Sequence, residues 1–157
     1  MESEITISLR EITLETLHEI LKLSVAPEQM EYVASNAVSI AQAHFHPEAW
    51  FRGIYAGDEA VGFVMLEDWS LSPDPAADRP VLLWRLMFDK SQQRKGFGNE
   101  ALKQIVEHVR TRTSLDHFFT SCVEGPNTPK PFYLKFGFVE TGRQIEGETV
   151  LRYDFGQ

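Results

Sequence analysis

The pattern of apolar and polar positions along the chain changes period several times, and each change predicts a boundary between strand and helix. Ile5, Ile7 and Leu9 alternate with polar residues, which is typical of a strand with one buried face. Helical spacing follows, first in a helix capped by Thr13 and then in a helix with Pro27 in its first turn. The apolar positions expected on these helices are Leu14, Leu17, Ile20 and Leu21 in the first and Met30, Val33, Ala34, Ala37, Val38 and Ala41 in the second.

The rest of the chain is expected to alternate between strands and helices. Aromatic and β-branched residues predict strands at 50–56 and 61–66, joined by a turn at Gly57 and Asp58. The later elements are, in order, a proline-rich loop (70–80), a strand (81–89), a helix that buries Leu102, Ile105, Val106 and Val109, a strand (117–123), a short helix begun by Pro129 or Pro131, and a hairpin (138–143 and 150–155). This order predicts an α/β (α+β) fold, with a mixed sheet of about seven strands and helices on both faces.

Length and composition fit a single globular domain over residues 1–157. Hydrophobic residues make up 43% and charged residues 24% of the chain, which are ordinary values for a folded protein. Neither side of the loop 70–80 can complete a core alone, so the loop is interpreted as a connection inside the domain. The net charge of −8, from 23 acidic and 15 basic residues, argues against nucleic acid or an anionic membrane as a partner and leaves room for a cationic substrate.

Cysteine content and the first residues suggest a reducing compartment. Cys122 is the single cysteine, so an internal disulfide is excluded, and it is interpreted as a core residue. Residues 1–5 carry neither a basic nor an apolar targeting pattern, and no apolar run is long enough to span a bilayer. The protein is therefore expected to be cytoplasmic.

Two glycines, Gly96 and Gly98, stand at the start of the helix that follows strand 81–89. A helix start offers backbone N–H groups without intrahelical partners, and glycine lets an anion approach them closely. Arg94 and Lys95 add positive charge in an otherwise acidic chain. The segment is therefore a candidate diphosphate-binding loop, although a Gly-x-Gly pair also occurs where a chain only turns tightly.

Two other phosphate-binding motifs fit this segment less well. A P-loop requires Gly-Lys-Ser/Thr at the helix start, whereas Gly98 is followed by Asn99 and Glu100. A dinucleotide fingerprint could use Ala101 as its third small residue, but it needs an acidic residue at the end of the next strand. Asp116 precedes that strand instead of ending it.

Two motifs in this half of the chain resemble those of the GNAT superfamily of N-acetyltransferases. Gln93-Arg94-Lys95-Gly96-Phe97-Gly98 resembles its Gln/Arg-x-x-Gly-x-Gly/Ala loop, and Phe132-Tyr133-Leu134-Lys135-Phe136-Gly137-Phe138 is similar to its Tyr-x-x-x-Gly-Phe segment. The resemblance covers residues 81–155. It implies that acetyl-CoA lies between two central parallel strands that splay apart, and that no metal is needed.

The resemblance also implies a set of contacts with acetyl-CoA. The pyrophosphate would lie on Gln93, Arg94, Lys95, Gly96, Phe97, Gly98 and Asn99, and the pantetheine arm would contact the backbone of Met87 and Phe88. Asn127 stands one residue closer to Tyr133 than the family pattern has it, so it either contacts CoA or caps the next helix. Lys135 either approaches the CoA phosphates or is merely exposed.

Tyr133 is the candidate catalytic residue. When an amine attacks the thioester directly, the tetrahedral intermediate expels a thiolate, and a phenol with a pKa near ~10 can protonate it. By resemblance Tyr133 occupies the position of the family's general acid; the alternative is a tyrosine that packs on Phe136 or Phe138. The base is not identified by pattern; Glu28, Glu31 and Glu67, acting through a water, are the candidates.

The acceptor is expected to be a small cationic amine. Residues 25–43 resemble the bacterial spermine/spermidine acetyltransferase-like subgroup, which implies a polyamine-like acceptor. Glu28, Glu31 and Tyr32 could hold an ammonium group, with Glu67 and Trp84 nearby, although such carboxylates also serve a helix dipole or solubility.

Two kinds of alternative stay open for the function. The acceptor could be an aminoglycoside, an amino acid or a protein N-terminus, or the chain could be an acyl-CoA-binding sensor without turnover. The family resemblance also raises the possibility of a homodimer.

Overall fold

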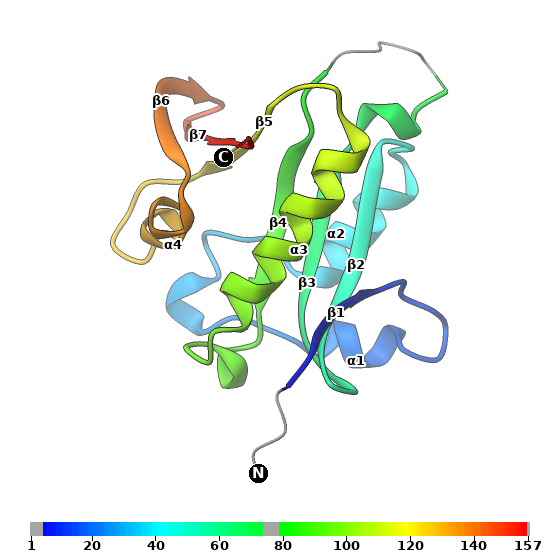
Figure 1. Ribbon diagram of the computed structural model, residues 1–157. Coiled ribbons are helices and arrows are strands. Elements are labelled where there is room, and N and C mark those ends of the chain that lie inside the picture. Colours follow the sequence, from blue (N-terminus) through cyan, green and yellow to red (C-terminus); the bar gives the residue numbers. More distant parts are fainter. Residues whose placement is uncertain (1–4, 74–78, 157) are drawn as a thin grey trace.

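The protein folds around one mixed β-sheet, as shown in the computed structural model of Figure 1, which describes residues 5–73 and 79–156. The strands are β1 (Ile7–Arg10), β2 (Ala49–Ala56), β3 (Glu59–Glu67), β4 (Leu82–Phe88), β5 (His117–Cys122), β6 (Val139–Ile145) and β7 (Glu148–Asp154). They lie in the order β1-β2-β3-β4-β5-β7-β6, and only β4 and β5 are parallel neighbours. The predicted mixed, mostly antiparallel sheet is confirmed.

Helices cover both faces of this sheet, as the sequence predicts. They are α1 (Leu17–Leu21), α2 (Asn36–His44), α3 (Phe97–Arg112) and α4 (Lys130–Phe136), with 3₁₀ turns η1 (Pro27–Gln29), η2 (Trp69–Leu71) and η3 (Lys90–Gln92). Alternate residues of β3 enter two different core clusters: Val64 and Leu66 pack with α3 and α4, whereas Phe63 and Met65 pack with α1 and α2. Figure 1 shows α3 crossing in front of the sheet and α2 behind it.

The first helix is shorter than predicted, and of the four apolar side chains expected on it only Ile20 is fully buried. It begins at Leu17, because a hydrogen-bonded turn precedes it. In this turn the Thr13 carbonyl accepts from the amides of Thr16 and Leu17, and the Thr13 amide donates to the Thr16 hydroxyl. Ile20 is completely buried, whereas Leu14 is 82% exposed. The expectation that Leu14 faces the core is therefore wrong.

The second predicted helix is interrupted. Pro27 begins only the short turn η1, and the helix α2 starts later, at Asn36, where the Ser35 hydroxyl accepts a hydrogen bond from the amide of Val38 at 3.2 Å. Met30, expected on an apolar helix face, is exposed. The non-helical chain between η1 and α2 is free to run beside the sheet, which matters for the site described below.

The loop predicted at 70–80 lies partly outside the described residues. Its first residues form the end of η2, and the backbone becomes extended again at β4. Among the described residues, no helix is long and apolar enough to cross a membrane. No group of three or more His, Cys, Asp and Glu side chains in this part of the chain is arranged to hold a metal ion.

Strands β4 and β5 diverge soon after they pair. Their parallel register contains Leu82 opposite Phe119 and Leu83 opposite Thr120, and the hydroxyl of Thr120 donates to the Leu83 carbonyl at 3.1 Å. On the other side of β4, the register with β3 shifts at Trp84, which is the extra residue of a β-bulge. The remainder of β4 therefore has no strand partner on the β5 side within the described chain, and the predicted splay is confirmed.

An ion pair between the buried Asp68 and the partly exposed Arg112 joins the end of β3 to the last turn of α3. Asp68 is 1% exposed, and its carboxylate accepts hydrogen bonds from the Nε of Arg112 at 3.1 Å and from the amide of Ser70 at 3.0 Å. Removing the arginine leaves the buried carboxylate without compensation.

We therefore expect Arg112→Leu to lower the free energy of unfolding by about 2 kcal/mol, measured by urea denaturation, because solvent screens the partly exposed guanidinium while the Asp68 carboxylate stays buried. The control is Arg110→Leu on the same helix, because Arg110 pairs at the surface with Glu107 at 3.6 Å and should lose less than about 1 kcal/mol. Equal losses in the two variants would show that the pair with Asp68 is not stabilising.

Candidate active site

A cavity of about 870 Å³ opens where β4 and β5 part. Its wall is formed by β4, the loop that leads into α3, the loop between β5 and α4, and the chain around η1. Of the residues proposed from the sequence, the wall contains Tyr32, Trp84, Met87, Phe88, Gln93, Arg94, Gly96, Phe97, Gly98, Asn99, Asn127, Tyr133 and Lys135. The cavity thus brings both sequence motifs to one space.

Four proposed residues lie outside the wall. Glu28 and Glu31 are exposed near η1, and Lys95 donates a hydrogen bond to Gln92 at 3.0 Å. Glu67 is half-buried at the end of β3, where Trp69 donates to its carboxylate at 3.1 Å. Burial, and the nearby Glu48 carboxylate to a lesser extent, raise the pKa of Glu67.

The loop before α3 presents an open backbone to the cavity. Gly96 is the N-cap residue of α3 and has φ of 82°, a conformation that side chains rarely tolerate. A Cβ atom added there would meet nothing within 4 Å. Since α3 is a regular helix of 16 residues, its first amides and the positive end of its dipole lie at the cavity wall, beside Arg94 and Lys135.

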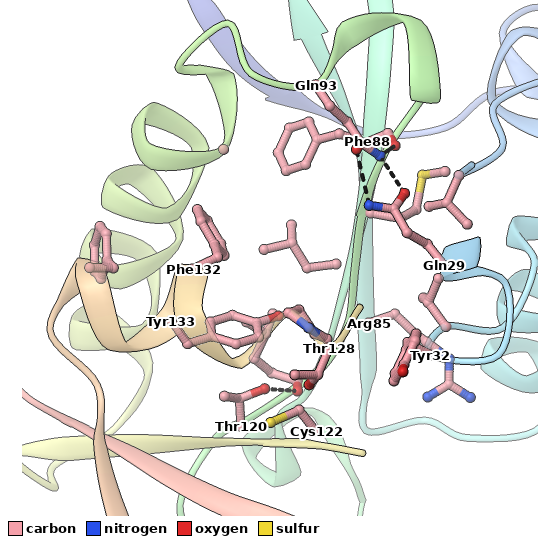
Figure 2. A pocket seen from close by; sticks show the side chains of 18 of the residues that line it. Gln29, Tyr32, Arg85, Phe88, Gln93, Thr120, Cys122, Thr128, Phe132 and Tyr133 are labelled. Atoms are coloured by element: carbon pink, nitrogen blue, oxygen red, sulfur yellow. Dashed lines mark hydrogen bonds between the residues drawn. The ribbon is translucent and has the colours of Figure 1, made fainter. Parts of the chain in front are cut away.

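Gln93 holds this loop against two other segments. Its Nε2 donates to the Phe88 carbonyl at 3.0 Å and to the Oε1 of Gln29 at 2.9 Å, and the Nε2 of Gln29 donates back to Gln93 at 3.1 Å (Figure 2). Gln29 belongs to η1, so these bonds join the start of the α3 loop, the end of β4 and the η1 turn. No sequence pattern selects Gln29, because its partner is far away in the chain.

Tyr133 lies at the other end of the cavity. It is 5% exposed, and its ring contacts those of Phe132 and Phe138, each with a centroid distance of 5.3 Å. Burial raises the pKa of the Tyr133 phenol far above its usual value, and a hydrogen bond with Thr120 offsets only part of this shift. The phenol is therefore neutral, and it is both a core residue and part of the wall.

Polar groups surround the Tyr133 end of the cavity, as Figure 2 shows for Thr120, Cys122 and Thr128. Cys122 is buried, as predicted, and it also lines the cavity. Burial raises the pKa of its thiol, so the thiol is protonated at neutral pH. Such a thiol is a poor nucleophile.

Tyr32 and Asn127 meet across the cavity wall. The amide of Asn127 donates to the Tyr32 hydroxyl at 3.3 Å, and a Cβ on Gly125 would lie 2.1 Å from this hydroxyl, so only glycine permits the contact. Pro129 is the N-cap residue of α4, and the amide of Lys130, the first helical residue, donates to the Thr128 hydroxyl at 3.4 Å, so Asn127 does not cap this helix. The segment between η1 and α2 is therefore joined to the loop before α4.

The charged residues of the wall are few. Arg94 and Lys135 accompany the start of α3, while Arg85 and Glu148 lie elsewhere along the wall, and Glu148 is the one carboxylate among the described lining residues. Arg85 is half-buried on β4; burial lowers the pKa of its guanidinium, which nevertheless stays charged. The sequence patterns single out neither Arg85 nor Glu148.

The sequence matches the profile of a known family. The profile of the Acetyltransferase (GNAT) family matches residues 12–138, so the chain belongs to that family and is an acetyl-CoA-dependent N-acetyltransferase. Two curated relatives are each 28% identical over 153 residues and cover 93% of this chain and 97% of their own length. They are a spermine/spermidine N(1)-acetyltransferase of Bacillus subtilis strain 168 and a probable spermine N(1)-acetyltransferase of Bacillus subtilis subsp. natto.

Solved structures share the fold. An acetyltransferase from Thermus thermophilus has a TM-score of 0.70 at 18% identity and covers 98% of this chain and 100% of its own. The PaiA N-acetyltransferase from Thermoplasma acidophilum, in complex with coenzyme A, has a TM-score of 0.67 at 14% identity, with coverages of 96% and 100%. The aminoglycoside acetyltransferase AAC(6')-Ib, also with coenzyme A, reaches 0.72 at 14% identity and covers 95% of each chain.

Proposed function

We propose that this chain acetylates the primary amine of a small acceptor in the cavity between β4 and β5, with Tyr133 as the general acid. One observation carries the proposal: the parted strands open into a cavity with the start of α3 at one end and a buried, neutral phenol at the other. Acetyl-CoA is an anion at its diphosphate and needs a proton at its sulfur, so the two ends of the cavity suit the two ends of the cosubstrate.

The diphosphate of acetyl-CoA would be held by the start of α3. The amides of Gly96, Phe97, Gly98 and Asn99 supply hydrogen-bond donors, and Arg94 and Lys135 supply charge. Gln93 orients the loop through its bonds to Phe88 and Gln29. Lys95 and Asn127 remain predicted contacts of the same molecule.

The unpaired side of β4 would receive the pantetheine arm. The amide of Asp89 donates to the Val61 carbonyl of β3 at 2.9 Å. Because backbone groups alternate along a strand, Met87 also faces β3, while Leu86 and Phe88 face the gap toward β5. We therefore assign the backbone contacts to Leu86 and to the amide of Phe88, because the Phe88 carbonyl already accepts from Gln93; Met87 contributes its side chain to the wall.

Transfer would be direct. The amine nitrogen forms a bond to the acetyl carbon while the bond from that carbon to sulfur breaks, and the sulfur takes the phenolic proton of Tyr133. The surplus proton of the amine passes through water to Glu148, and a proton from solvent restores the phenol. Glu28, Glu31 and Glu67 were reasonable bases from the sequence, but they do not line the cavity, so Glu148 takes this role in the proposal.

The class of acceptor is supported by the names of relatives and by charge, not by the geometry of the cavity alone. The names of the two Bacillus relatives favour a polyamine-like acceptor such as spermidine, and the net charge of −8 favours a cation. Tyr32 and Trp84 in the wall offer aromatic faces that attract ammonium groups. The rivals are another amine, as in aminoglycosides, amino acids or protein N-termini, and a sensor that binds acyl-CoA without turnover.

The proposal also takes the chain as one N-acetyltransferase domain over residues 1–157 that works in the cytoplasm. A homodimer stays a prediction, which sedimentation analysis would test.

Release of free CoA thiol tests the function. Purified protein is incubated with acetyl-CoA alone and with spermidine, spermine, an aminoglycoside or amino acids. Thiol release that depends on an amine supports the transferase. Binding of acetyl-CoA with no release for any amine would contradict the proposal and favour a sensor.

The raised pKa of Tyr133 predicts an unusual pH profile. The value of kcat/KM should rise with pH as the acceptor amine, with a pKa near ~10, loses its proton. It should not fall again below about pH 10, because the acid keeps its proton until the pH passes its raised pKa. A decline with a midpoint below about pH 9 would contradict the assignment of Tyr133 as the acid.

A further inference from the structure

Arg85 occupies an unusual place in the cavity. It lies on the part of β4 that has separated from β5, and Figure 2 shows its guanidinium on the same side as Tyr32, far from the Gln93 loop. On the same strand, Trp84 and Met87 pack with the core cluster on the α1 and α2 side of the sheet. The start of α3 lies on the other face. Arg85 is therefore remote from the proposed diphosphate site.

Among the described residues, the Arg85 guanidinium has no carboxylate partner. One terminal nitrogen donates to the backbone carbonyl of Trp84 at 3.2 Å and the other to the amide oxygen of Gln42 at 3.2 Å. The buried Nε has no hydrogen-bond partner in the described chain, and no described carboxylate lies within ion-pair distance. A guanidinium carries five N–H donors, and after these bonds each terminal nitrogen of Arg85 keeps one N–H for a ligand.

Besides these hydrogen bonds, the guanidinium lies 5.5 Å from the centroid of the Trp84 ring, and this contact supplies no anion. A half-buried guanidinium costs free energy unless an anion compensates it, and its planar donors match a carboxylate. The one carboxylate in the described wall, Glu148, is close enough to influence the pKa of Arg85 but not to pair with it. The described wall thus carries a guanidinium, that of Arg85, and one carboxylate that are not within ion-pair distance of each other.

We propose that Arg85 binds a carboxylate of the acceptor, so that the preferred acceptor is an amine that also carries a carboxylate. The inference rests on the proposed acetyltransferase function and restricts the acceptor to amines that carry a carboxylate. An aliphatic diamine with a carboxylate, as in lysine or ornithine, satisfies both this requirement and the cationic character expected from the relatives. A plain polyamine leaves Arg85 without an anion and adds positive charge beside it.

Matched acceptors test the inference. Steady-state kinetics with acetyl-CoA would compare lysine with lysine amide and with cadaverine, and ornithine with putrescine, because each pair differs at the carboxylate. Spermidine is included as the polyamine. We expect kcat/KM for lysine to exceed that for lysine amide by about tenfold or more, as one charge-assisted pair provides.

Variants assign this preference to Arg85. Arg85→Gln should remove the difference between lysine and lysine amide by raising KM for lysine, and Arg85→Lys should keep part of it. The KM for acetyl-CoA should not change. Arg52→Gln is the control, because Arg52 is also half-buried on a strand, stacks on Trp50 at 4.4 Å and lies outside the cavity wall.

The possible outcomes distinguish a failure of the carboxylate-binding inference from a failure of the proposed acetyltransferase function. Equal or better turnover of cadaverine or spermidine would overturn the inference and leave the acetyltransferase in place, and so would a raised KM for acetyl-CoA in Arg85→Gln. Calorimetric binding of lysine to the protein saturated with CoA needs no turnover. Binding lost in Arg85→Gln but kept in Arg52→Gln supports the carboxylate site, and absence of binding to the unmodified protein contradicts it.

Discussion

Tyr133→Phe is expected to lower kcat by about 100-fold or more while the affinity for CoA stays unchanged. The substitution removes one hydroxyl from a side chain that is otherwise packed against Phe132 and Phe138, so the fold should be kept. Without the phenol, the leaving sulfur must depart as a thiolate in a buried site, which is costly. The measurement is steady-state thiol release together with calorimetric titration of CoA.

The chain contains a well-matched control for this variant. Tyr55 is 3% exposed, its hydroxyl donates to Glu19 at 3.0 Å, and it does not line the cavity. Tyr55→Phe also removes a hydroxyl from a buried tyrosine, so it reveals any general loss through stability. If both variants keep full kcat, Tyr133 is not the acid and serves only the core.

The second large effect is expected at the start of α3. Gly96→Val should raise the KM for acetyl-CoA by about tenfold or more, because the added side chain would project into the open space beside the first amides of the helix. The φ of 82° at Gly96 also makes any β-branched residue strained, by about 1–3 kcal/mol. The loss of affinity must therefore be separated from a loss of stability.

Gly57→Val makes this separation. Gly57, in the turn between β2 and β3, has φ of 60°, and a Cβ added there also meets nothing within 4 Å. The two variants should lose similar free energy of unfolding, but only Gly96→Val should weaken the thermal stabilisation by CoA. The same KM for acetyl-CoA in both variants would contradict a diphosphate site at Gly96.

Much of the fold was predictable because its signals are local. The alternation of Ile5, Ile7 and Leu9, the aromatic and β-branched residues of β2 and β3, and the helical spacing of Leu102, Ile105 and Val109 each lie within one short stretch of the chain. The errors concern the helix boundaries. Hydrogen bonds to the side chains of Thr16 and Ser35 fix where the first two helices begin, whereas apolar spacing alone would extend both helices. The bulge at Trp84 depends on pairing with β3, which no local pattern reveals.

The residues of the site also fall into those that local sequence patterns reveal and those that depend on distant segments. Residues in the two contiguous motifs, from Gln93 to Asn99 and around Tyr133, could be proposed from the sequence, and most of them line the cavity. Gln29, Arg85 and Glu148 could not, because they gain their surroundings from segments far away in the chain. Glu28 and Glu31 are close in the sequence to residues that line the cavity. At the turn η1, however, their own side chains are exposed to solvent.

The most direct test of direct transfer follows the acetyl group itself. Isotope-labelled acetyl-CoA and an amine acceptor are added to the protein, and mass spectrometry records both the intact protein and the small molecules during turnover. The account predicts that the label appears on the acceptor nitrogen while the mass of the protein stays unchanged. Label that accumulates on the protein, for example at Cys122, or that appears only as free acetate, would contradict it.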